Sequence, residues 1–435
     1  MGEIDYVTRH FTSPLEVDAA QWDALLAHAP EANPFMRHGY LAAMLQSGSA
    51  CAGTGWQAHC ITLWRGDQLE AACIVYLKAH SYGEYVFDWA WANAYAQHGL
   101  AYYPKALVAV PFTPVPGVRL LASTPAARRA LLGALLAWCQ ARKLSSLHLL
   151  FCSDEDVAAA TDANLMLRHT VQFHWKNVAP RLPAARGSLP PEGARFPLGR
   201  PGGETSKFTD FDHFLASLSQ EKRKKIRQER RKVAEAGVTF RWAVGTDITP
   251  ADWDFFYRCY ERTYLEHGNA PYLSRDFFTR MQNAMPQHWL LFVAERDGRP
   301  IASSLIAITA RNTVATTQND LNNGSEPPPE VAYGRYWGAL ERVDCLHFEA
   351  CYYQPLAWCI ERGYQRFEGG AQGEHKMARA LLPVKTTSAH WLAHPAFADA
   401  VERFLAREGQ GIENYLEHLD ERNPFKRGGP CPTPD

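Results

Sequence analysis

Several features that mark common protein classes are missing from this chain. Its ten cysteines are scattered, with no CxxC pair and no Cys/His cluster at zinc spacing. We therefore expect no metal site and interpret the thiols as small buried groups in a reducing compartment. No apolar run approaches the roughly 18–20 residues of a membrane span. The segment Met1–His10 contains acids and no apolar core, which predicts a cytoplasmic protein without a secretory signal.

A surplus of charge of either sign is also missing. The sequence has 45 basic and 46 acidic residues, which argues against a surface coated in positive potential for duplex DNA. Its 435 residues suffice for two or three domains, and 46% hydrophobic against 21% charged residues excludes a disordered chain. Aromatic residues make up 12%, enough for some to line a pocket while others fill the core.

Two stretches rich in Pro and Gly interrupt the chain, Pro180–Gly203 and Asn319–Glu330. Such a composition excludes a helix or a central strand. We interpret the first as a linker or long surface loop and the second as an insertion within a strand pair of the second half.

An internal repeat is the most informative feature of the organisation. Leu136–Cys139 recurs as Leu356–Cys359, an offset of 220 positions. Each copy ends a helical pattern, follows a hairpin with a Gly-containing turn, and precedes a short strand. The hairpins and strands are expected at His59–Leu77, Trp289–Ile308, Ser146–Phe151 and Gln365–Glu368.

This repeated order resembles the acyl-CoA N-acyltransferase (GNAT) fold. Two such units in one chain are the architecture of the Fem-type aminoacyl transferases of peptidoglycan synthesis. The basic run Glu221–Lys232, followed by Ala236–Val238, is similar to the helix that opens the second Fem domain. Phe255–Tyr264 resembles its next helix, and Ile360–Gly370 resembles a segment near the Fem C-terminus.

A closer resemblance is to the FemAB-like family of predicted N-acyltransferases, often described as peptidoglycan biosynthesis/recognition proteins. Ala380 stands where that pattern leads us to expect glycine. The matching runs are His80–Asp88, Tyr102–Lys105, Pro111–Pro114, Tyr333–Gly338, Leu346–Gln354, Gly370–Lys376 and Ser388–Trp391.

The resemblance implies an α/β (α+β) chain of two tandem GNAT-like domains, with mixed central sheets flanked by helices. We place the domains at residues 1–195 and 196–435, the basic helix 221–232 opening the second. The implied activity is N-acyl transfer to an amine of a cell-wall precursor or a long-chain amino lipid. The alternative is a non-catalytic protein that recognises muropeptide or another cell-envelope ligand.

N-acyl transfer needs a proton acceptor for the amine and donors for the oxyanion, and three clusters offer such groups. In the first, Glu374 and His375 follow two glycines and precede Lys376 and Arg379, so a Gly-rich turn could bring backbone amides to a ligand. In the second, His347 and Glu349 alternate on an expected strand, so both would point to one face. A solvated loop and an edge strand are the structural alternatives.

The third cluster is Glu84 and Asp88 in an aromatic segment that we expect to be a strand. Rings beside a carboxylate favour a raised pKa suited to a general base. The further substrate-binding candidates are Lys105, Arg335, Tyr336, Tyr353, Lys376 and Arg379.

Eight Lys or Arg residues occur within Glu221–Lys232, on an expected helix. Such a helix is either a solvated face or a surface for the phosphates of CoA, tRNA or an anionic lipid headgroup. Our candidates for donor binding are Arg223, Lys224, Arg227 and Arg230.

The Gly-rich pyrophosphate motif of acyl-CoA enzymes is absent before both expected helices. We expect no permanently bound cofactor, with acyl-CoA or aminoacyl-tRNA as co-substrate. We also allow a peripheral contact with the inner membrane surface.

Overall fold

The computed structural model describes residues 6–179, 206–310, 329–371 and 373–425. Pro180–Gly203 and all but the last two residues of Asn319–Glu330 lie outside this range. In the first half the elements are β1 (Val7–Phe11), α1 (Ala19–Ala27), α2 (His38–Gln46), β2 (Trp56–Arg65), β3 (Gln68–Lys78), α3 (Trp89–Gln97), β4 (Lys105–Val108), β5 (Leu121–Ala122), α4 (Pro125–Ala141), β6 (Ser146–Leu149), α5 (Asp154–Asp162) and β7 (Met166–Lys176).

The second half repeats this order with differences near its end. Its elements are α6 (Phe211–Ser217), α7 (Gln220–Glu235), β8 (Val238–Val244), α8 (Pro250–Glu266), α9 (Arg275–Ala284), β9 (Trp289–Arg296), β10 (Arg299–Ile308), β11 (Val331–Ala339), α11 (Leu346–Phe348), α12 (Gln354–Glu361), β12 (Arg366–Glu368), β13 (Leu382–Leu392) and α13 (Pro395–Glu421).

Local sequence explains the helices and hairpins that were expected. Thr249 caps α8 in a capping box with Asp252, and Pro250 occupies the first turn, where its missing N–H costs nothing. In the β9–β10 turn, Asp297 and Gly298 both have positive φ, as a tight two-residue hairpin turn requires. The predicted hairpins, the repeated helices and the strands after them are confirmed.

The strands form one sheet in the order β1-β2-β3-β4-β6-β13-β7-β12-β11-β10-β9-β8, with β5 paired to β3. Each half contains one parallel pair, β4 with β6 and β11 with β12, between antiparallel neighbours. This mixed α/β architecture confirms the expected fold class. The second Pro-rich stretch separates β10 from β11, which pair directly, as expected of an insertion within a strand pair.

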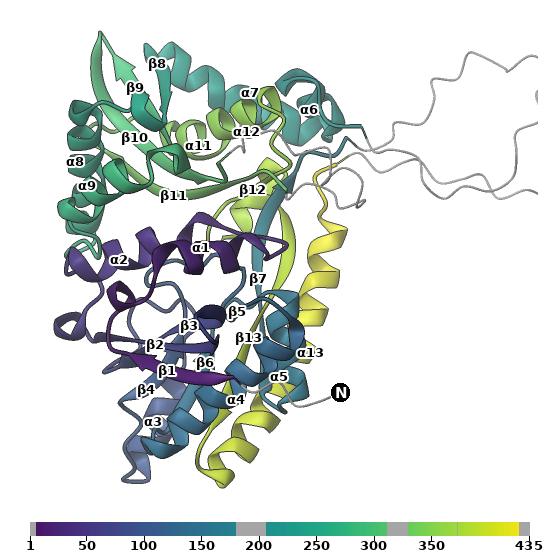
Figure 1. Cartoon of the computed structure of the whole chain (residues 1–435). Helices are drawn as coiled ribbons and strands as arrows, with labels where there is room; N and C mark the ends of the chain where they lie inside the picture. Colours follow the sequence, from purple (N-terminus) through teal and green to yellow (C-terminus); the bar gives the residue numbers. More distant parts are fainter. Residues whose placement is uncertain (1–5, 180–205, 311–328, 372, 426–435) are drawn as a thin grey trace, which may run out of the picture.

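The halves exchange their last strands. β13 from the second half lies between β6 and β7 of the first, and β7 pairs with β12 of the second. Figure 1 shows β7 and β13 running between the two halves, with α13 alongside them. The boundary at residues 195 and 196 lies outside the described range and stays a prediction.

The two halves also share a core. Tyr40 of α2 packs edge-on against Phe277 of α9, and Phe35 packs in the same way against Tyr333 of β11. Both pairs belong to one buried cluster that includes Trp22 and Trp253. Much of the aromatic excess therefore fills the junction between the halves.

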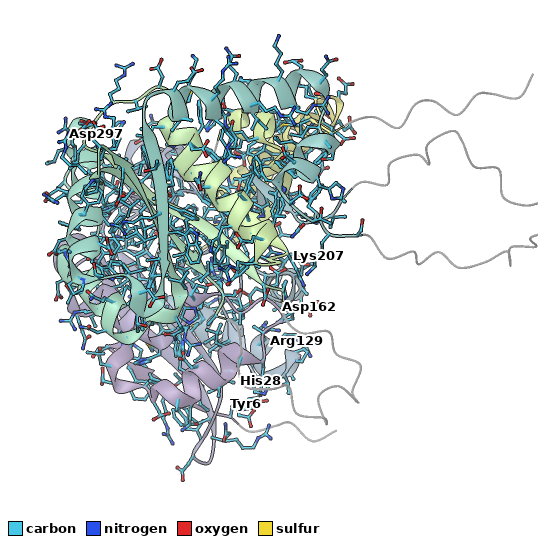
Figure 2. All side chains as sticks on the ribbon, turned by 90° about the horizontal axis from the view of Figure 1, so that it is seen from above. Tyr6, His28, Arg129, Asp162, Lys207 and Asp297 are labelled. Atoms are coloured by element: carbon cyan, nitrogen blue, oxygen red, sulfur yellow. The ribbon has the colours of Figure 1, made fainter. Side chains whose placement is uncertain are left out.

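Exposed charged side chains surround this core, and a smaller set, which includes Lys105 and Glu368, is buried. Figure 2 shows Asp297, at the tip of the β9–β10 hairpin, on the opposite side of the molecule from Arg129 and Asp162. Within the described ranges, no helix combines the length and apolar character that a membrane span needs.

Candidate functional site

The parallel strands β11 and β12 separate in the middle of the sheet. Their last paired residues are Tyr333 and Glu368, although β11 continues to Ala339. Gly369 follows at once, where an added Cβ would lie 2.5 Å from the Leu381 side chain. A larger residue at this position would have to displace the Leu381 side chain, and its Cβ would lie 3.4 Å from the Phe173 carbonyl oxygen of β7.

A pocket of about 280 Å³ lies beside this point. On the side of β7 that faces β12, only the last three residues of β7, His174 to Lys176, are paired, because β12 ends at Glu368. Among the described strands, the residues of β7 before His174 have no partner on that side. Past His174 and Glu368, the Gly369 N–H donates to the Phe173 carbonyl at 3.3 Å. The pocket is lined by Tyr85, Phe151, Thr170, Val171, Gln172, Phe173, Ala371, Gly373, Glu374, Ile412 and Tyr415.

A buried acid stands behind the pocket wall. Glu368 is 3% exposed, and burial raises its pKa to about 7 despite the opposing charge of Arg366. Arg366 Nε donates to Glu368 Oε1 at 3.0 Å. Among the described residues, Oε2 has no hydrogen-bond partner and lies 3.9 Å from His174 Nε2.

This acid connects to the pocket through β7. His174 Nε2 lies 3.2 Å from the side-chain oxygen of Gln172, which lines the pocket. Burial, with the cations Arg366, Lys376 and Lys176, lowers the pKa of His174 to about 3. The imidazole is therefore neutral at pH 7, while the neighbouring acid is balanced between its two forms.

Lys376 shapes the turn on the other side of the pocket. Its Nζ donates to the carbonyls of Gly370 and Ala371, both at 3.0 Å. Burial lowers the pKa of this lysine to about 8. A trans peptide points its N–H opposite to its C=O, so the Ala371 N–H is turned away from Lys376.

Glu374 and His375, predicted as an acid–base pair, point in different directions. Glu374 borders the pocket, is exposed, and accepts from the Tyr415 hydroxyl at 2.7 Å and from Arg422 at 2.8 Å. These two bonds lower its pKa, which does not favour a role as base. His375 instead lies 3.3 Å from the Tyr352 hydroxyl. Their catalytic roles stay predictions.

The expected strand at His347 and Glu349 is wrong. Leu346–Phe348 is helical, a π-helical turn spans Glu349–Tyr353, and α12 continues to Glu361. Pro355 lies in the first turn of α12, and a proline clashes with the carbonyl four residues earlier in a regular α-helix. The wider π turn, Glu349–Tyr353, lies just before Pro355, so the chain stays helical from Leu346 to Glu361 despite the proline.

His347 and Glu349 consequently diverge. The His347 ring packs edge-on against Tyr352, with 5.8 Å between the ring centroids. The Tyr352 ring also packs against His375, so both histidines contact this tyrosine. Glu349 is buried and accepts from Arg230 at 3.1 Å and Gln354 at 2.7 Å. Burial raises its pKa, and Arg230 opposes that shift.

Basic helix α7 is confirmed as a helix and is fastened by its buried face. Glu229 accepts from Arg379 at 3.0 Å and from the Tyr353 hydroxyl. Arg379 also stacks on Phe348, 3.5 Å from the ring centroid. Arg230, Tyr353 and Arg379 therefore hold α7 in place, whereas Arg223, Lys224 and Arg227 remain at least partly exposed on its outer face.

The expected strand at Glu84 and Asp88 is also wrong, because Gly83 and Tyr85 have positive φ and the segment loops. Both acids bind one buried cation. Lys105 Nζ donates to Glu84 at 2.8 Å, to Ser81 at 2.8 Å and to Asp88. Burial raises the pKa of Glu84 to about 7. This cluster lies in the first half and, within the described ranges, forms no hydrogen bond or ion pair with His347 or His375.

Arg335 and Tyr336 lie on β11 where the halves meet. Arg335 Nη2 donates to the Phe112 carbonyl at 2.7 Å. Its charge lowers the pKa of Glu368 slightly, the smallest of several effects on that acid. Tyr336 is buried against Phe278 and Tyr260.

Sequence reasoning missed Glu368, His174, Gln172 and Arg366 as functional candidates. One signal was present, because Glu368 ends a short strand directly before two glycines. Its partners on β7 gave no signal, since they come from the other half of the chain.

Within the described residues, no group of three or more His, Cys, Asp or Glu side chains could hold a metal ion. The cysteines described are free, and six of them are buried.

A model of the FemAB-like family, described as peptidoglycan biosynthesis/recognition, matches residues 13–181 and 204–427. No curated protein matches the chain significantly. Among solved structures, FemX has 10% sequence identity and a TM-score of 0.50, covering 91% of this chain and 100% of FemX.

Two further structures cover similar shares. The C-terminal domain of a putative lysylphosphatidylglycerol synthetase from Agrobacterium fabrum has 10% identity, a TM-score of 0.46, and coverage of 91% and 97%. A tandem GNAT protein from the clavulanic acid pathway has 11% identity, a TM-score of 0.40, and coverage of 90% and 99%. The family match spans most of the sequence, and the chain belongs to the FemAB-like family of peptidoglycan biosynthesis/recognition proteins.

Proposed function

We propose that this protein is an N-acyltransferase that transfers an acyl or aminoacyl group to an amine bound in the pocket beside β7. Family membership and the fold make a transfer reaction the natural starting point. The observation that carries the proposal is Glu368, a buried carboxyl group with a pKa of about 7 behind the pocket wall. A base of that strength takes a proton from an amine most effectively near neutral pH.

In the proposed reaction the amine nitrogen attacks the donor carbonyl carbon. The new C–N bond forms, and the C–S bond of a thioester or the C–O bond of an aminoacyl ester breaks. Because Glu368 does not itself line the pocket, the amine proton passes to it through one water molecule. The leaving thiolate or alkoxide then takes that proton from the Glu368 carboxyl group, which returns to its carboxylate form. The Ala371 N–H, turned away from Lys376 at the pocket wall, would stabilise the oxyanion.

The donor is an acyl thioester or an aminoacyl-tRNA, and the exposed cations of α7 are our candidates for its phosphates. Arg223, Lys224 and Arg227 are not engaged in the buried contacts that hold this helix. We propose a cell-wall precursor or a long-chain amino lipid as acceptor. A thermal-shift comparison of acyl-CoA with charged tRNA separates the donors, because a ligand that binds the native state raises its stability.

Glu368→Gln tests the chemistry, and Glu374→Gln is its matched control. Glu368→Gln is expected to lower turnover about 10²–10⁴-fold, the usual range for a general base, while substrate affinity stays nearly unchanged. Glu374→Gln should keep most of the activity. The opposite pattern would place the base on the rim of the pocket.

The alternative, recognition of an envelope ligand without turnover, predicts a different result. The separation of Glu84 from His347 and His375 favours this alternative, whereas the buried acid Glu368 near the pocket favours an enzyme. Saturable binding of a muropeptide by the wild-type protein, with no acyl product from any donor, would establish recognition.

A further inference from the structure

One end of the molecule exposes a long uncharged surface. Residues 89–104 contain no Lys, Arg, Asp or Glu, although they include exposed helix α3. Tyr82 is 60% exposed, Phe87 47%, Trp89 38% and Leu100 40%. A solvent-facing helix normally has a charged outer face, so this concentration of apolar side chains marks an interaction surface. We call these four residues the aromatic end.

The aromatic end is held rigidly. The loop before α3 is tied to Lys105 through Ser81, Glu84 and Asp88, all buried. The exposed residues themselves are anchored by their backbones. The Tyr82 carbonyl accepts from Lys78 at 3.2 Å, and the Phe87 carbonyl accepts from Arg168 at 2.7 Å. Their rings are thus presented to solvent by a fixed backbone.

The same loop reaches the candidate site. Tyr85, between Tyr82 and Phe87, lines the pocket. Figure 1 shows α3 at one extremity of the molecule and basic helix α7 at the other. Tyr85 therefore links the pocket to the aromatic end, while the segment of Glu374 and Arg379 links the same pocket to the basic helix through Glu229.

We propose that the aromatic end docks this protein on a lipid bilayer, with Tyr82, Phe87, Trp89 and Leu100 seated in the interfacial layer. Tyr and Trp favour that layer because their rings are apolar and their polar atoms reach water. Protein interfaces are usually enriched in Arg, whereas residues 89–104 contain no Lys, Arg, Asp or Glu. The proposal is independent of the reaction proposed above.

Vesicle flotation tests the proposal with the full chain and phosphatidylcholine vesicles, which carry no net charge. The wild-type protein should float with the vesicles at both low and high salt, because the aromatic end contributes no charge to be screened. The triple variant Tyr82→Ser/Phe87→Ser/Trp89→Ser should partition at least about tenfold more weakly, since its apolar contact area is lost. These side chains are exposed, so the melting temperature should be unchanged.

The matched control is Trp242→Ser/Leu265→Ser, which removes large side chains that are 44% and 62% exposed elsewhere. It should float like the wild-type protein. Absence of wild-type flotation, or equal flotation of the triple variant, would overturn the proposal. So would flotation that requires anionic lipid and disappears in Arg223→Gln/Lys224→Gln/Arg227→Gln. Sedimentation velocity supplies one more test, because a dimer dissolved by the triple variant would assign the surface to a second copy.

Discussion

Replacing Lys105 with methionine tests the buried ion cluster of the first half. Lys105 is 0% exposed and donates to Ser81, Glu84 and Asp88. Burial by itself would raise the pKa of Asp88, but Lys105 and His148 outweigh it and hold the pKa well below its usual range. Without the cation, the Asp88 carboxylate would be a buried charge whose remaining lysine neighbour, Lys78, is mostly uncharged at pH 8, because burial lowers the pKa of Lys78 to about 7.

The expected cost is large. Removing one partner of a buried ion pair costs about 3–5 kcal/mol, whereas an exposed pair is worth about 0–1 kcal/mol. Glu84 softens the loss because its raised pKa, about 7, lets it take a proton. Asp88 cannot relieve its burial in the same way, because it stays ionised above neutral pH. We therefore expect Lys105→Met to lower the free energy of unfolding by about 3 kcal/mol or more at pH 8.

Urea titration followed by circular dichroism measures this loss. In the variant, the folded-state pKa of Asp88 rises above its unfolded value, so the penalty grows as pH rises and is smaller at pH 5. The double variant Lys105→Met/Asp88→Asn removes the orphaned charge and should recover part of the stability. A loss below about 1 kcal/mol at pH 8, or no recovery in the double variant, would refute the reasoning.

Three further predictions concern the second half. Gly338→Ala should destabilise the protein by several kcal/mol in urea titration, because its Cβ would lie 1.9 Å from a backbone oxygen of α8, whereas Gly133→Ala meets nothing within 4 Å and should be neutral or slightly stabilising. Glu229→Gln should loosen α7, which faster amide exchange there would report, since its carboxylate binds Arg379 and Tyr353. The pKa of Glu368 in the folded protein, about 7, lies above its unfolded value near 4.5. The free energy of unfolding of the wild-type protein should therefore fall by roughly 3 kcal/mol relative to that of Glu368→Gln as pH rises from 4.5 to 7. Parallel plots of unfolding free energy against pH for the two proteins would contradict this.

The hairpins and helices were predictable because their signals are local. The Asp297–Gly298 turn and the capping residues of α8 each act within a few positions of themselves. The exchange of β7 and β13 was not predictable in this way, since it depends on pairing between strands far apart in sequence. The family pattern predicted glycine at Ala380, and this residue has a φ of +61°, a left-handed conformation that glycine adopts most easily.

The candidate site was predictable only in part. The Gly-rich segment after β12 was identified, and Ala371, Gly373 and Glu374 do line the pocket. Glu368 escaped notice because its raised pKa comes from burial, which a lone acid in a sequence does not reveal. The strand expected at Glu84 failed because positive φ at Gly83 and Tyr85 turns an aromatic run of high strand propensity into a loop. The strand expected at His347 failed because alternation over three residues does not exclude the helical and π turns found there.

The central claim is that Glu368 accepts the amine proton in an acyl transfer. The most direct measurement is the rate of amide formation against pH, for the wild-type protein and Glu368→Gln, with acyl-CoA or charged tRNA as donor and an extract of cell-envelope amines as acceptor. We predict that the wild-type rate rises through about pH 7, following the pKa of Glu368, and that the variant loses at least about 10²-fold in rate together with that rise. A variant that keeps both the wild-type rate and its rise with pH would contradict the claim.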